Sequence, residues 1–510
     1  RISRDYTQFG NIFSAPSDLV RQAWMRTSST GPIVDSKEVI GRDGDRDKIL
    51  SMIVDPMETL CVLPLVGIGG IGKTTLAQVV YNNEWVENHY DLRLWVCIRQ
   101  VFDCEEVVRK IVESLTQESL PHWDMAQLQN RLLPLMRRNK CLIVLDNVWN
   151  HDSLGSNWLG LKSLLGFGDA RRTVLITTRS NTVARLMGTV DQYGLGDLKA
   201  EDSWRLFQRV VSTQSREPRF EEIGKEIVRM CPNVPLVIHA IGCLLRGMDS
   251  IDSWEAFRDQ LVRETLCGHV PSIMKTLKLS YDQLHPNGLK LCFLYWSLFP
   301  KGFKLEKDKF IYMCVALGYV ETPRQENKNL ADVAEDYLGR LKDLGLIGLQ
   351  RSMDEQWYLK MHDTIQDLAI SLPKSRCKMV DHGEQQLDES IQHVSFSKFA
   401  ELPWNLPWSS LFKIQKQVQS VHVWPMRSRP IKLTLKGLSK FEYLRVFSLP
   451  DVGLEEVPTT ICKLIHLRCL DLSRNKFRKL PKEISQLTNM LYLNLSDCEE
   501  LQKLPGELGG

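Results

Sequence analysis

The sequence lacks the paired cysteines that are typical of a secreted protein. None of its 13 cysteines forms a C-x-x-C spacing, and several lie inside apolar runs, among them Cys97, Cys141 and Cys292. This usage is typical of reduced, buried thiols in a cytosolic protein, and it argues against a disulfide-bonded framework.

The sequence also lacks a membrane-spanning run and an excess of charge of one sign. A transmembrane helix needs roughly 18 consecutive apolar residues, whereas the longest run here, residues 234–245, is interrupted by His239 and Gly242. The 65 basic and 62 acidic residues leave a net charge of only +3. Composition therefore gives no argument for binding to nucleic acid or to an anionic membrane.

Neither an initiator methionine nor a signal-peptide pattern stands at residue 1. We therefore expect the sequence to be a piece of a longer protein, in which the polar residues 1–31 form a linker from a missing N-terminal domain. The length of 510 residues predicts three to five domains, each with its own core. Apolar and charged contents of 43% and 25% are those of a soluble globular protein.

The clearest motif lies at residues 67–74, which fit G-x-x-x-x-G-K-[ST] between a predicted strand and a predicted helix. Its glycines let successive backbone N–H groups approach phosphate oxygens without Cβ clashes. The helix that begins at Lys73 adds the positive end of its dipole, Lys73 can reach the β- and γ-phosphates, and the Thr74 hydroxyl can ligate Mg²⁺. The motif therefore predicts a nucleotide-binding loop.

Two later strands are predicted to end at the same edge of the sheet. Residues 141–145 are apolar and are followed by Asp146, which predicts a buried parallel strand with an acid at the end where ligands lie. Downstream of a phosphate loop this is the Walker B pattern, in which Asp146 holds the water shell of Mg²⁺. The strand predicted at residues 173–178 is followed by Arg179, which can sense a γ-phosphate; a surface arginine that closes the strand is the alternative.

The order of these motifs resembles that of the NB-ARC ATPases of plant disease-resistance proteins. Trp149 and the block at residues 292–304 are similar to the coiled-coil class of that family, whose coiled coil would lie upstream of residue 1. The landmarks run from about residue 38 to 370 and include LIVLDNVW at 142–149, ITTR at 176–179, CPNVPL at 231–236, CFLYWSLFPKGFK at 292–304 and MHD at 361–363.

The resemblance implies a multidomain fold in which an α/β P-loop NTPase domain is followed by a helical domain, a winged-helix domain and a leucine-rich-repeat solenoid. Helical periodicity at residues 200–211, 220–231 and 254–263 agrees with this order. Winged helices often bind DNA, but in this family they usually clamp nucleotide. We expect a linker at 1–31, the nucleotide-binding domain at 32–196, the helical domain at 197–268, the winged-helix domain at 272–375, a transitional segment at 376–435 and repeats at 436–510.

The resemblance also implies a set of nucleotide contacts. The backbone near Val39 and Ile40 and the ring of Pro235 would hold the adenine, Arg179 would read the γ-phosphate, and His362 would meet the diphosphate in the resting state. The implied cofactors are ADP or ATP, with Mg²⁺ bound by Thr74 and Asp146. The loop contacts expected are Gly67, Gly69, Gly70, Ile71, Gly72, Lys73, Thr74 and Thr75.

His362 also has a structural alternative, because a histidine between a methionine and an aspartate is more often a structural residue than a ligand. We expect Asp363 to cap a helix over residues 364–371 by accepting a backbone N–H, while His362 points a ring nitrogen at the β-phosphate.

Two positions depart from the family pattern. Asn147 stands where a second acid usually activates water, and an amide cannot accept a proton near neutral pH. We therefore assign no catalytic residue, expect at most a slow ATPase of the STAND type, and expect Asn147→Asp to raise phosphate release with ADP affinity nearly unchanged. Asn233 and Val234 replace the first two residues of a Gly-Leu-Pro-Leu motif; asparagine is the least costly substitute for a glycine with positive φ.

The C-terminal part contains a repeat. The pattern L-x-x-[FL]-x-L begins at Leu444 and Leu467, and again with a methionine at Met490, so the period is 23 residues, within the range of leucine-rich repeats. Each repeat is expected to place a short strand on a concave face and to stack on the next repeat. The array looks cut short, and residues 376–435 show no pattern beyond a transitional cap.

The main hypothesis is an ADP- and ATP-binding switch of an intracellular plant immune receptor, which rests with ADP and is activated by nucleotide exchange on pathogen perception. The expected partners are a pathogen effector or a guarded host protein, bound through the repeats, together with self-association on activation. We expect no nucleic-acid partner and no transmembrane segment. The expected location is cytoplasmic, with the nucleus and the plasma-membrane periphery as alternatives.

Two other functions fit the sequence less well. One is a non-hydrolysing, nucleotide-bound scaffold that acts through protein binding by the repeats. The other is a P-loop phosphotransferase, which would need an acceptor pocket and a catalytic base; Asn147 counts against it.

Overall fold

The computed structural model describes residues 34–506 apart from several gaps. The predicted linker at residues 1–31 and the last four residues lie outside the described part of the chain. The gaps are residues 55–58, 99–101, 119, 121–122, 150–152, 169, 212–216, 266–271, 323–327, 352–354, 373–375, 381–387, 398–413 and 425–437.

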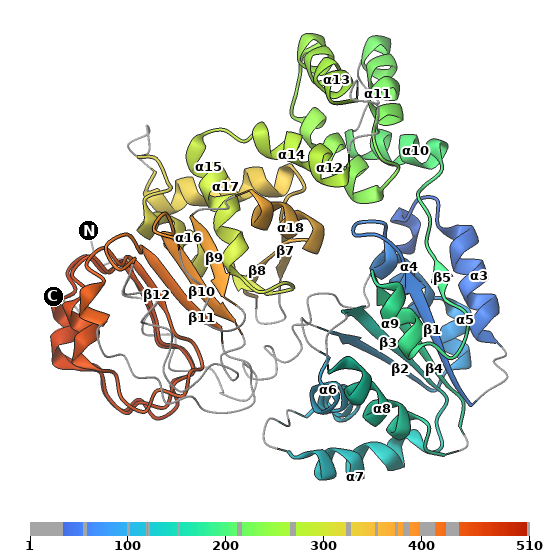
Figure 1. Ribbon diagram of the computed structural model, residues 1–510, viewed down its shortest axis with the longest axis horizontal. Helices are drawn as coiled ribbons and strands as arrows, with labels where there is room; N and C mark the ends of the chain where they lie inside the picture. Colours follow the sequence, from blue (N-terminus) through green and yellow to red (C-terminus); the bar gives the residue numbers. More distant parts are fainter. Residues whose placement is uncertain are drawn as a thin grey trace.

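A five-stranded parallel sheet in the order β2-β3-β4-β1-β5 forms the first domain (Figure 1). The central strands β1, β3 and β4 are buried along nearly their whole length because helices cover both faces. The strands β3 and β4 begin within one residue of the predicted runs. The strands are β1 (Leu60–Val66), β2 (Leu92–Cys97), β3 (Cys141–Val148), β4 (Arg172–Thr178) and β5 (Tyr193–Gly194).

Helices flank this sheet, and side chains fix where several of them begin. Asp103, Asp124 and Ser180 each accept a backbone N–H at the start of a helix, which satisfies a donor that has no partner within the helix. The elements are η2 (Ser36–Glu38), α3 (Asp43–Val54), α4 (Lys73–Tyr81), α5 (Glu84–His89), α6 (Cys104–Thr116), α7 (Met125–Met136), α8 (Leu154–Leu165) and α9 (Asn181–Met187).

Four helices follow the sheet. Three of them lie where helical periodicity was predicted, whereas α12 was not predicted, because it is apolar around most of its circumference. Pro235 lies in its first turn, where a missing N–H costs little, and residues 237–245 are buried apart from His239. The helices are α10 (Ala200–Val211), α11 (Pro218–Met230), α12 (Pro235–Arg246) and α13 (Ile251–Thr265).

The next segment combines helices with a small antiparallel sheet in the order β6-β8-β7, which is the winged-helix arrangement. Its last helix, α18, begins directly after β8. The elements are α14 (Ile273–Asp282), α15 (Asn287–Tyr295), η4 (Trp296–Leu298), β6 (Leu305–Glu306), α16 (Lys307–Leu317), α17 (Leu330–Asp343), β7 (Gly348–Arg351), β8 (Trp357–Lys360) and α18 (Asp363–Ser371).

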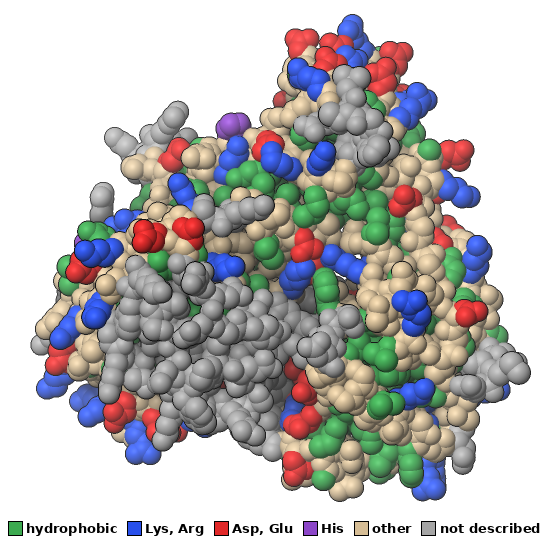
Figure 2. Space-filling model, viewed as in Figure 1, with side chains coloured by type: hydrophobic (Ala, Val, Ile, Leu, Met, Phe, Trp, Pro, Cys, Tyr) green, Lys and Arg blue, Asp and Glu red, His purple; other side chains and the backbone are tan. Residues whose placement is uncertain are grey.

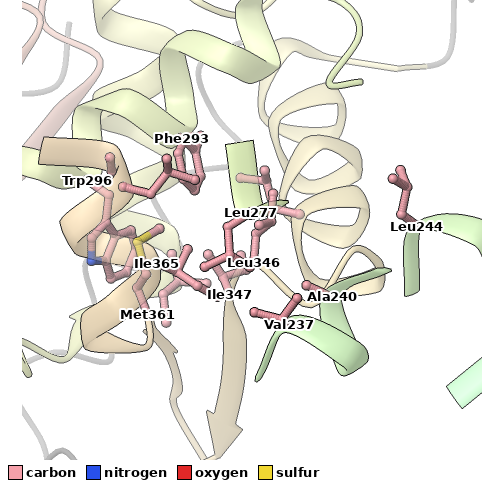
Figure 3. Close-up of a cluster of buried hydrophobic side chains, with 14 of the residues drawn as sticks. Val237, Ala240, Leu244, Leu277, Phe293, Trp296, Leu346, Ile347, Met361 and Ile365 are labelled. Carbon is pink, nitrogen blue, oxygen red and sulfur yellow. The ribbon is translucent and has the colours of Figure 1, made fainter. Parts of the chain in front are cut away.

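One hydrophobic core runs through the helical and winged-helix segments (Figure 3). Side chains from α12 lie beside side chains from α14, α15 and α18, and all of them are at most 5% exposed. Packing of this kind holds α18 in a fixed place relative to α12. The residues labelled in Figure 3 are Val237, Ala240, Leu244, Leu277, Phe293, Trp296, Leu346, Ile347, Met361 and Ile365.

The C-terminal segment is a six-stranded parallel sheet in the order β14-β13-β12-β11-β10-β9. The repeat strands β12, β13 and β14 begin 23 residues apart, as the leucine pattern predicts. The segment that showed no pattern in the sequence adds β9, β10 and β11 to the same sheet. The elements are β9 (Cys377–Val380), β10 (His393–Ser397), β11 (Ser420–Trp424), η6 (Leu438–Lys440), β12 (Val446–Ser448), η7 (Thr459–Lys463), β13 (Cys469–Asp471), η8 (Lys482–Gln486) and β14 (Tyr492–Asn494).

The described surface and cysteines agree with the composition. Figure 2 shows basic and acidic side chains interspersed over the visible face. No disulfide bond joins the cysteines of the described segments, and ten of these cysteines are buried. None of the described helices is long and apolar enough to cross a membrane.

Candidate nucleotide-binding site

The phosphate loop connects β1 to α4. Gly70 (φ 81°) and Gly72 (φ 100°) lie in the left-handed region, which other residues rarely adopt. Gly72 precedes the first turn of α4, whose N–H groups have no partner within the helix. Lys73 Nζ donates to the carbonyl oxygens of Gly67 (2.7 Å) and Ile68 (2.9 Å), so the lysine side chain lies against the loop.

Thr74, Asp146 and Thr177 form a hydrogen-bonded set at the carboxyl edge of the sheet. The Oγ1 atoms of Thr74 and Thr177 donate to the same Asp146 Oδ1, at 2.8 Å and 2.6 Å. Asp146 is fully buried. The structure therefore brings together the two residues predicted to hold Mg²⁺, and it adds Thr177, which the sequence analysis did not assign.

Asn147 leaves the strand ladder directly after Asp146. Its φ is 66°, the β3–β4 register shifts between Leu145 and Val148, and its N–H donates to Thr177 Oγ1 at 2.8 Å. Its side-chain Nδ2 donates to Asp363 Oδ2 at 3.0 Å. The residue that replaces the usual second acid thus contacts the winged-helix segment.

Arg179, which follows β4, is held by α18. Its Nη1 forms an ion pair with Asp367 Oδ2 at 3.0 Å, and its Nη2 donates to Thr364 Oγ1 at 3.3 Å. Lys301 also pairs with Asp367. Both cations lie over the Trp149 ring, with Arg179 Cζ 5.1 Å and Lys301 Nζ 4.5 Å from its centroid, a favourable cation–π geometry.

The phosphate loop also touches α18 directly, at Gly69. A Cβ atom built on Gly69 would lie 2.5 Å from Thr364 Oγ1 and 2.8 Å from Arg179 Cζ. Any side chain at this position would therefore push the helix or the arginine away from the loop.

His362, and not Asp363, caps α18. Thr364 N donates to His362 Nδ1 at 3.1 Å, and Asp363 is the first residue of the helix. The prediction that Asp363 provides the cap is therefore wrong, because the histidine ring takes the N–H and leaves the Asp363 carboxylate to Asn147.

The cap fixes the chemical form of His362. Since Nδ1 accepts a hydrogen bond, the neutral ring carries its proton on Nε2 and presents an N–H donor there. His362 as a whole residue is exposed, yet the surrounding protein desolvates its imidazole, and the nearby Arg179, Lys360 and Lys73 repel a further positive charge. Both effects lower the pKa of His362 to about 3, so the ring is neutral near pH 7.

Val39 and Ile40, the residues implied to hold the adenine, lie close in sequence to Arg42, and the Arg42 side chain is hydrogen-bonded to the phosphate loop. Val39 is the C-cap residue that follows η2, and Ile40 comes next. Arg42 is 6% exposed and donates to the carbonyl oxygens of Ile71 (2.8 Å) and Gly196 (3.0 Å). This arginine ties the segment to the loop, and the sequence analysis did not assign it.

Pro235 lies next to the loop from the other side. It begins α12, and the N–H of the following Leu236 donates to the Gly70 carbonyl oxygen at 3.3 Å. A Cβ atom on Gly70 would lie 2.8 Å from Leu236 Cβ. The loop is therefore enclosed by α12 and α18, which come from two different segments.

The site offers cationic hydrogen-bond donors, Lys73 and Arg179, to an anion. Burial, with Arg179 nearby, lowers the pKa of Lys73 to about 8, although Asp146 and Asp363 oppose this shift. A bound anion would favour the protonated lysine. Among the described residues no group of three or more histidines, cysteines or acids could hold a metal ion.

Three family models match the chain in the order of these segments. The NB-ARC domain matches residues 42–217, the disease resistance protein winged helix domain matches residues 298–369, and a leucine-rich repeat region matches residues 417–509. The chain belongs to the NB-ARC disease-resistance family. Its NB-ARC fold implies that it binds a nucleotide.

Relatives of this NB-ARC protein come from plants. Disease resistance protein RGA2 of Solanum bulbocastanum is 35% identical over 487 residues, which cover 94% of this chain and 46% of the relative. Disease resistance RPP13-like protein 4 of Arabidopsis thaliana is 30% identical over 515 residues, which cover 96% of this chain and 58% of the relative. The chain thus spans about half the length of these relatives.

One of the solved structures that match this chain is that of a signal transduction ATPase with numerous domains from Pyrococcus horikoshii, which has a tetratricopeptide repeat sensor. The TM-score is 0.41 at 17% identity, over 63% of this NB-ARC chain and 41% of the other. A likeness this distant carries no inference about function.

Proposed function

We propose that this chain contains the nucleotide-operated switch of an intracellular plant immune receptor, which rests with ADP and is activated when ATP replaces it. The observation that carries the proposal is the contact of α18 with the phosphate loop, where Gly69 lies against Thr364 and Arg179. A nucleotide at this loop would touch two domains. Its phosphates could therefore bias how these domains are arranged.

The donors around the loop suit a diphosphate. When a nucleotide is bound, Lys73 and the N–H groups at the start of α4 would donate hydrogen bonds to its phosphate oxygens. His362 would offer Nε2–H to the β-phosphate, because its Nδ1 is occupied by the cap. Val39, Ile40 and Pro235 would hold the adenine.

Arg179 would distinguish ATP from ADP. Its guanidinium is paired with Asp367 and Thr364, and a γ-phosphate would compete for the same donors, since charge-assisted bonds to phosphate are among the strongest available. In the ADP state Arg179 would stay on α18. In the ATP state it would leave Asp367, and the winged-helix domain would lose that contact.

Mg²⁺ fits the site only together with a nucleotide. Thr74 and Asp146 offer one hydroxyl and one carboxylate, and Mg²⁺ is commonly bound by one or two protein oxygens, waters and phosphates. Hydrolysis would be slow, because Asn147 cannot act as a base. Resetting would then depend mainly on nucleotide exchange.

The repeats would supply the recognition surface. A leucine-rich-repeat array binds other proteins through its extended concave surface, and we propose a pathogen effector or a guarded host protein as the partner. Activation would then lead to self-association of a protein that resides in the cytoplasm.

Analysis of the nucleotide that co-purifies with the chain tests the proposal. We expect about one ADP per chain in the wild type and much less in Lys73→Ala, together with an ADP-dependent rise in thermal midpoint that the variant loses. Arg185→Ala, on α9 away from the loop contacts, serves as a control that keeps ADP.

Other outcomes would favour other functions. A chain that holds no nucleotide, and whose midpoint ADP does not raise, would act as a scaffold. Transfer of phosphate to an added small-molecule acceptor would indicate a phosphotransferase. An undiminished ADP effect in Lys73→Ala would contradict the loop assignment.

A further inference from the structure

We propose that Asn147 is a positioning residue that holds the winged-helix domain against the nucleotide-binding domain by donating its amide proton to Asp363. An aspartate at this position could not make this contact. The inference deepens the proposed function, because it treats the contact as part of the resting, ADP-bound arrangement.

The backbone around Asn147 points its side chain at this contact. The shift of the β3–β4 register at residues 145–148 takes Asn147 out of the ladder, and Thr177 Oγ1 holds its N–H. Asparagine tolerates a φ of 66° better than most residues because its side chain is short and polar. A fixed turn of the backbone therefore presents the short side-chain amide of Asn147 to α18.

Asp363, on the winged-helix side of the contact, is also held in place by its surroundings. It is the first residue of α18, whose start is fixed by the His362 cap, and the next turn of the helix holds Arg179 through Asp367. The Asn147 Nδ2 to Asp363 Oδ2 distance of 3.0 Å is that of an ordinary hydrogen bond. In the described part of the chain, the side-chain amide of Asn147 is the donor to this carboxylate.

An aspartate at residue 147 would reverse the interaction. Two carboxylates would face each other at hydrogen-bond distance beside the buried Asp146, and like charges at this separation repel. Lys73 and Arg179 would screen part of the repulsion, but both already have partners. The acid that would help hydrolysis is therefore incompatible with this closed contact.

This inference changes the expectation for Asn147→Asp. The sequence analysis expected the substitution to leave ADP affinity nearly unchanged. With the contact to Asp363 in view, we expect it to speed ADP release, because the closed arrangement that retains ADP is weakened.

A charge-reversal cycle tests the proposal. ADP release from the full chain is measured by chasing a fluorescent ADP analogue in the wild type, Asn147→Asp, Asp363→Asn and the double variant. We expect roughly tenfold faster release from Asn147→Asp. Asp363→Asn should stay within about threefold of the wild type, because two amides can still bond. The double variant should return to within about threefold, because its carboxylate and amide are exchanged.

Two results would overturn the inference. One is an ADP release rate in Asn147→Asp that equals that of the wild type. The other is a double variant that releases ADP as fast as Asn147→Asp, which would mean that the amide and carboxylate do not act as a pair.

The test separates this inference from the proposed function. If the wild type holds no ADP, the proposed function fails, and the contact is then tested by hydrogen exchange of residues 363–371 in the nucleotide-free chain. Faster exchange in Asn147→Asp, reversed in the double variant, would still support the contact. Equal exchange in all four proteins would contradict it.

Discussion

At the scale of single residues, His362 combines two functions in one ring. Its Nδ1 accepts the first N–H of α18, and this leaves Nε2 as a neutral donor for a phosphate. The cap hydrogen bond holds the ring in place. The two functions can be separated, because serine also caps helices well but has no donor that reaches as far as an imidazole ring.

We predict that His362→Ala releases ADP faster and signals in leaf tissue without a pathogen cue when it is placed in the complete receptor. It should also lose about 1 kcal/mol of stability through the missing cap. His362→Ser should restore the stability but not ADP retention. ADP dissociation and thermal midpoints of both variants check this. Normal ADP retention in His362→Ser would mean that the histidine acts only as a cap.

At the scale of elements, α18 gathers most of the contacts that join the winged-helix segment to the phosphate loop. Its first two turns provide Asp363, Thr364 and Asp367 to residues at the ends of β3 and β4. Since these residues lie on one short helix, a small movement of α18 would break all of the contacts together. This makes α18 a suitable element for a two-state switch.

We predict that Asp367→Asn raises the preference for ATP over ADP by about tenfold, within the usual range of coupling between sites. The substitution keeps the shape of the side chain but removes the anion that holds Arg179 and Lys301, so the arginine can turn to a γ-phosphate. Competition between ATP and ADP measures the ratio. Asp336→Asn removes an exposed ion pair with Lys328 and should leave the ratio unchanged. Equal ratios in all three proteins would show that Asp367 does not restrain Arg179.

The elements that could be predicted from the sequence are those with a local signal. The strands β1 to β4 are short apolar runs bounded by polar residues, and the loop motif fixes its own strand and helix. The helix α12 was missed because its apolar residues follow one another almost without a break and it is buried on nearly all sides, and the strands β9 to β11 contain no leucine. In each case tertiary packing, and not local sequence, decides the structure.

The site was predictable only where family motifs mark it. Arg42 stands beside Val39 and Ile40 and could have been found, since an arginine directly before a predicted helix is available to bond a neighbouring loop. In the sequence, Lys301 is 122 residues and Asp367 is 188 residues away from Arg179. Nothing local relates them to it, so their contacts required the structure.

At the scale of the whole molecule, the winged-helix segment also packs against the repeat sheet. The Lys309 ammonium of α16 pairs with Asp471 of β13, and the two residues are 7% and 0% exposed. Trp424 of β11 donates its indole N–H to the Leu298 carbonyl oxygen at 3.0 Å. A partner that approached this face of β11 to β13 would have to displace α16. In the proposed switch, the same domain would therefore link nucleotide state to partner binding.

Two histidines lie inside this interface. His422 Nε2 is 2.6 Å from the Tyr295 hydroxyl, and His393 Nε2 is 2.8 Å from the Tyr319 hydroxyl. Both rings are at most 3% exposed. Burial lowers the pKa of each to about 3; Arg376 and Arg445 add to this shift at His393, while Lys309 adds to it and Asp471 opposes it at His422.

We predict that the contact between the winged-helix segment and the repeats weakens as the pH falls. The pKa of each histidine is near 6.5 when the contact is open and about 3 when it is closed. Open chains therefore take up protons that closed chains do not, so the contact is fully stable above about pH 6.5 and loses stability below it. Between pH 6.5 and pH 5 the loss should be about 2 kcal/mol for each histidine.

Hydrogen exchange of residues 393–397 and 420–424, corrected for the intrinsic effect of pH, measures this loss. Substituting both His393 and His422 by glutamine, which can still bond to the tyrosines, should remove most of the pH dependence. His466→Gln, at an exposed position of the same repeat sheet, should retain it. If the double variant loses protection on acidification as steeply as the wild type, other groups open this interface, because glutamine does not titrate in this range.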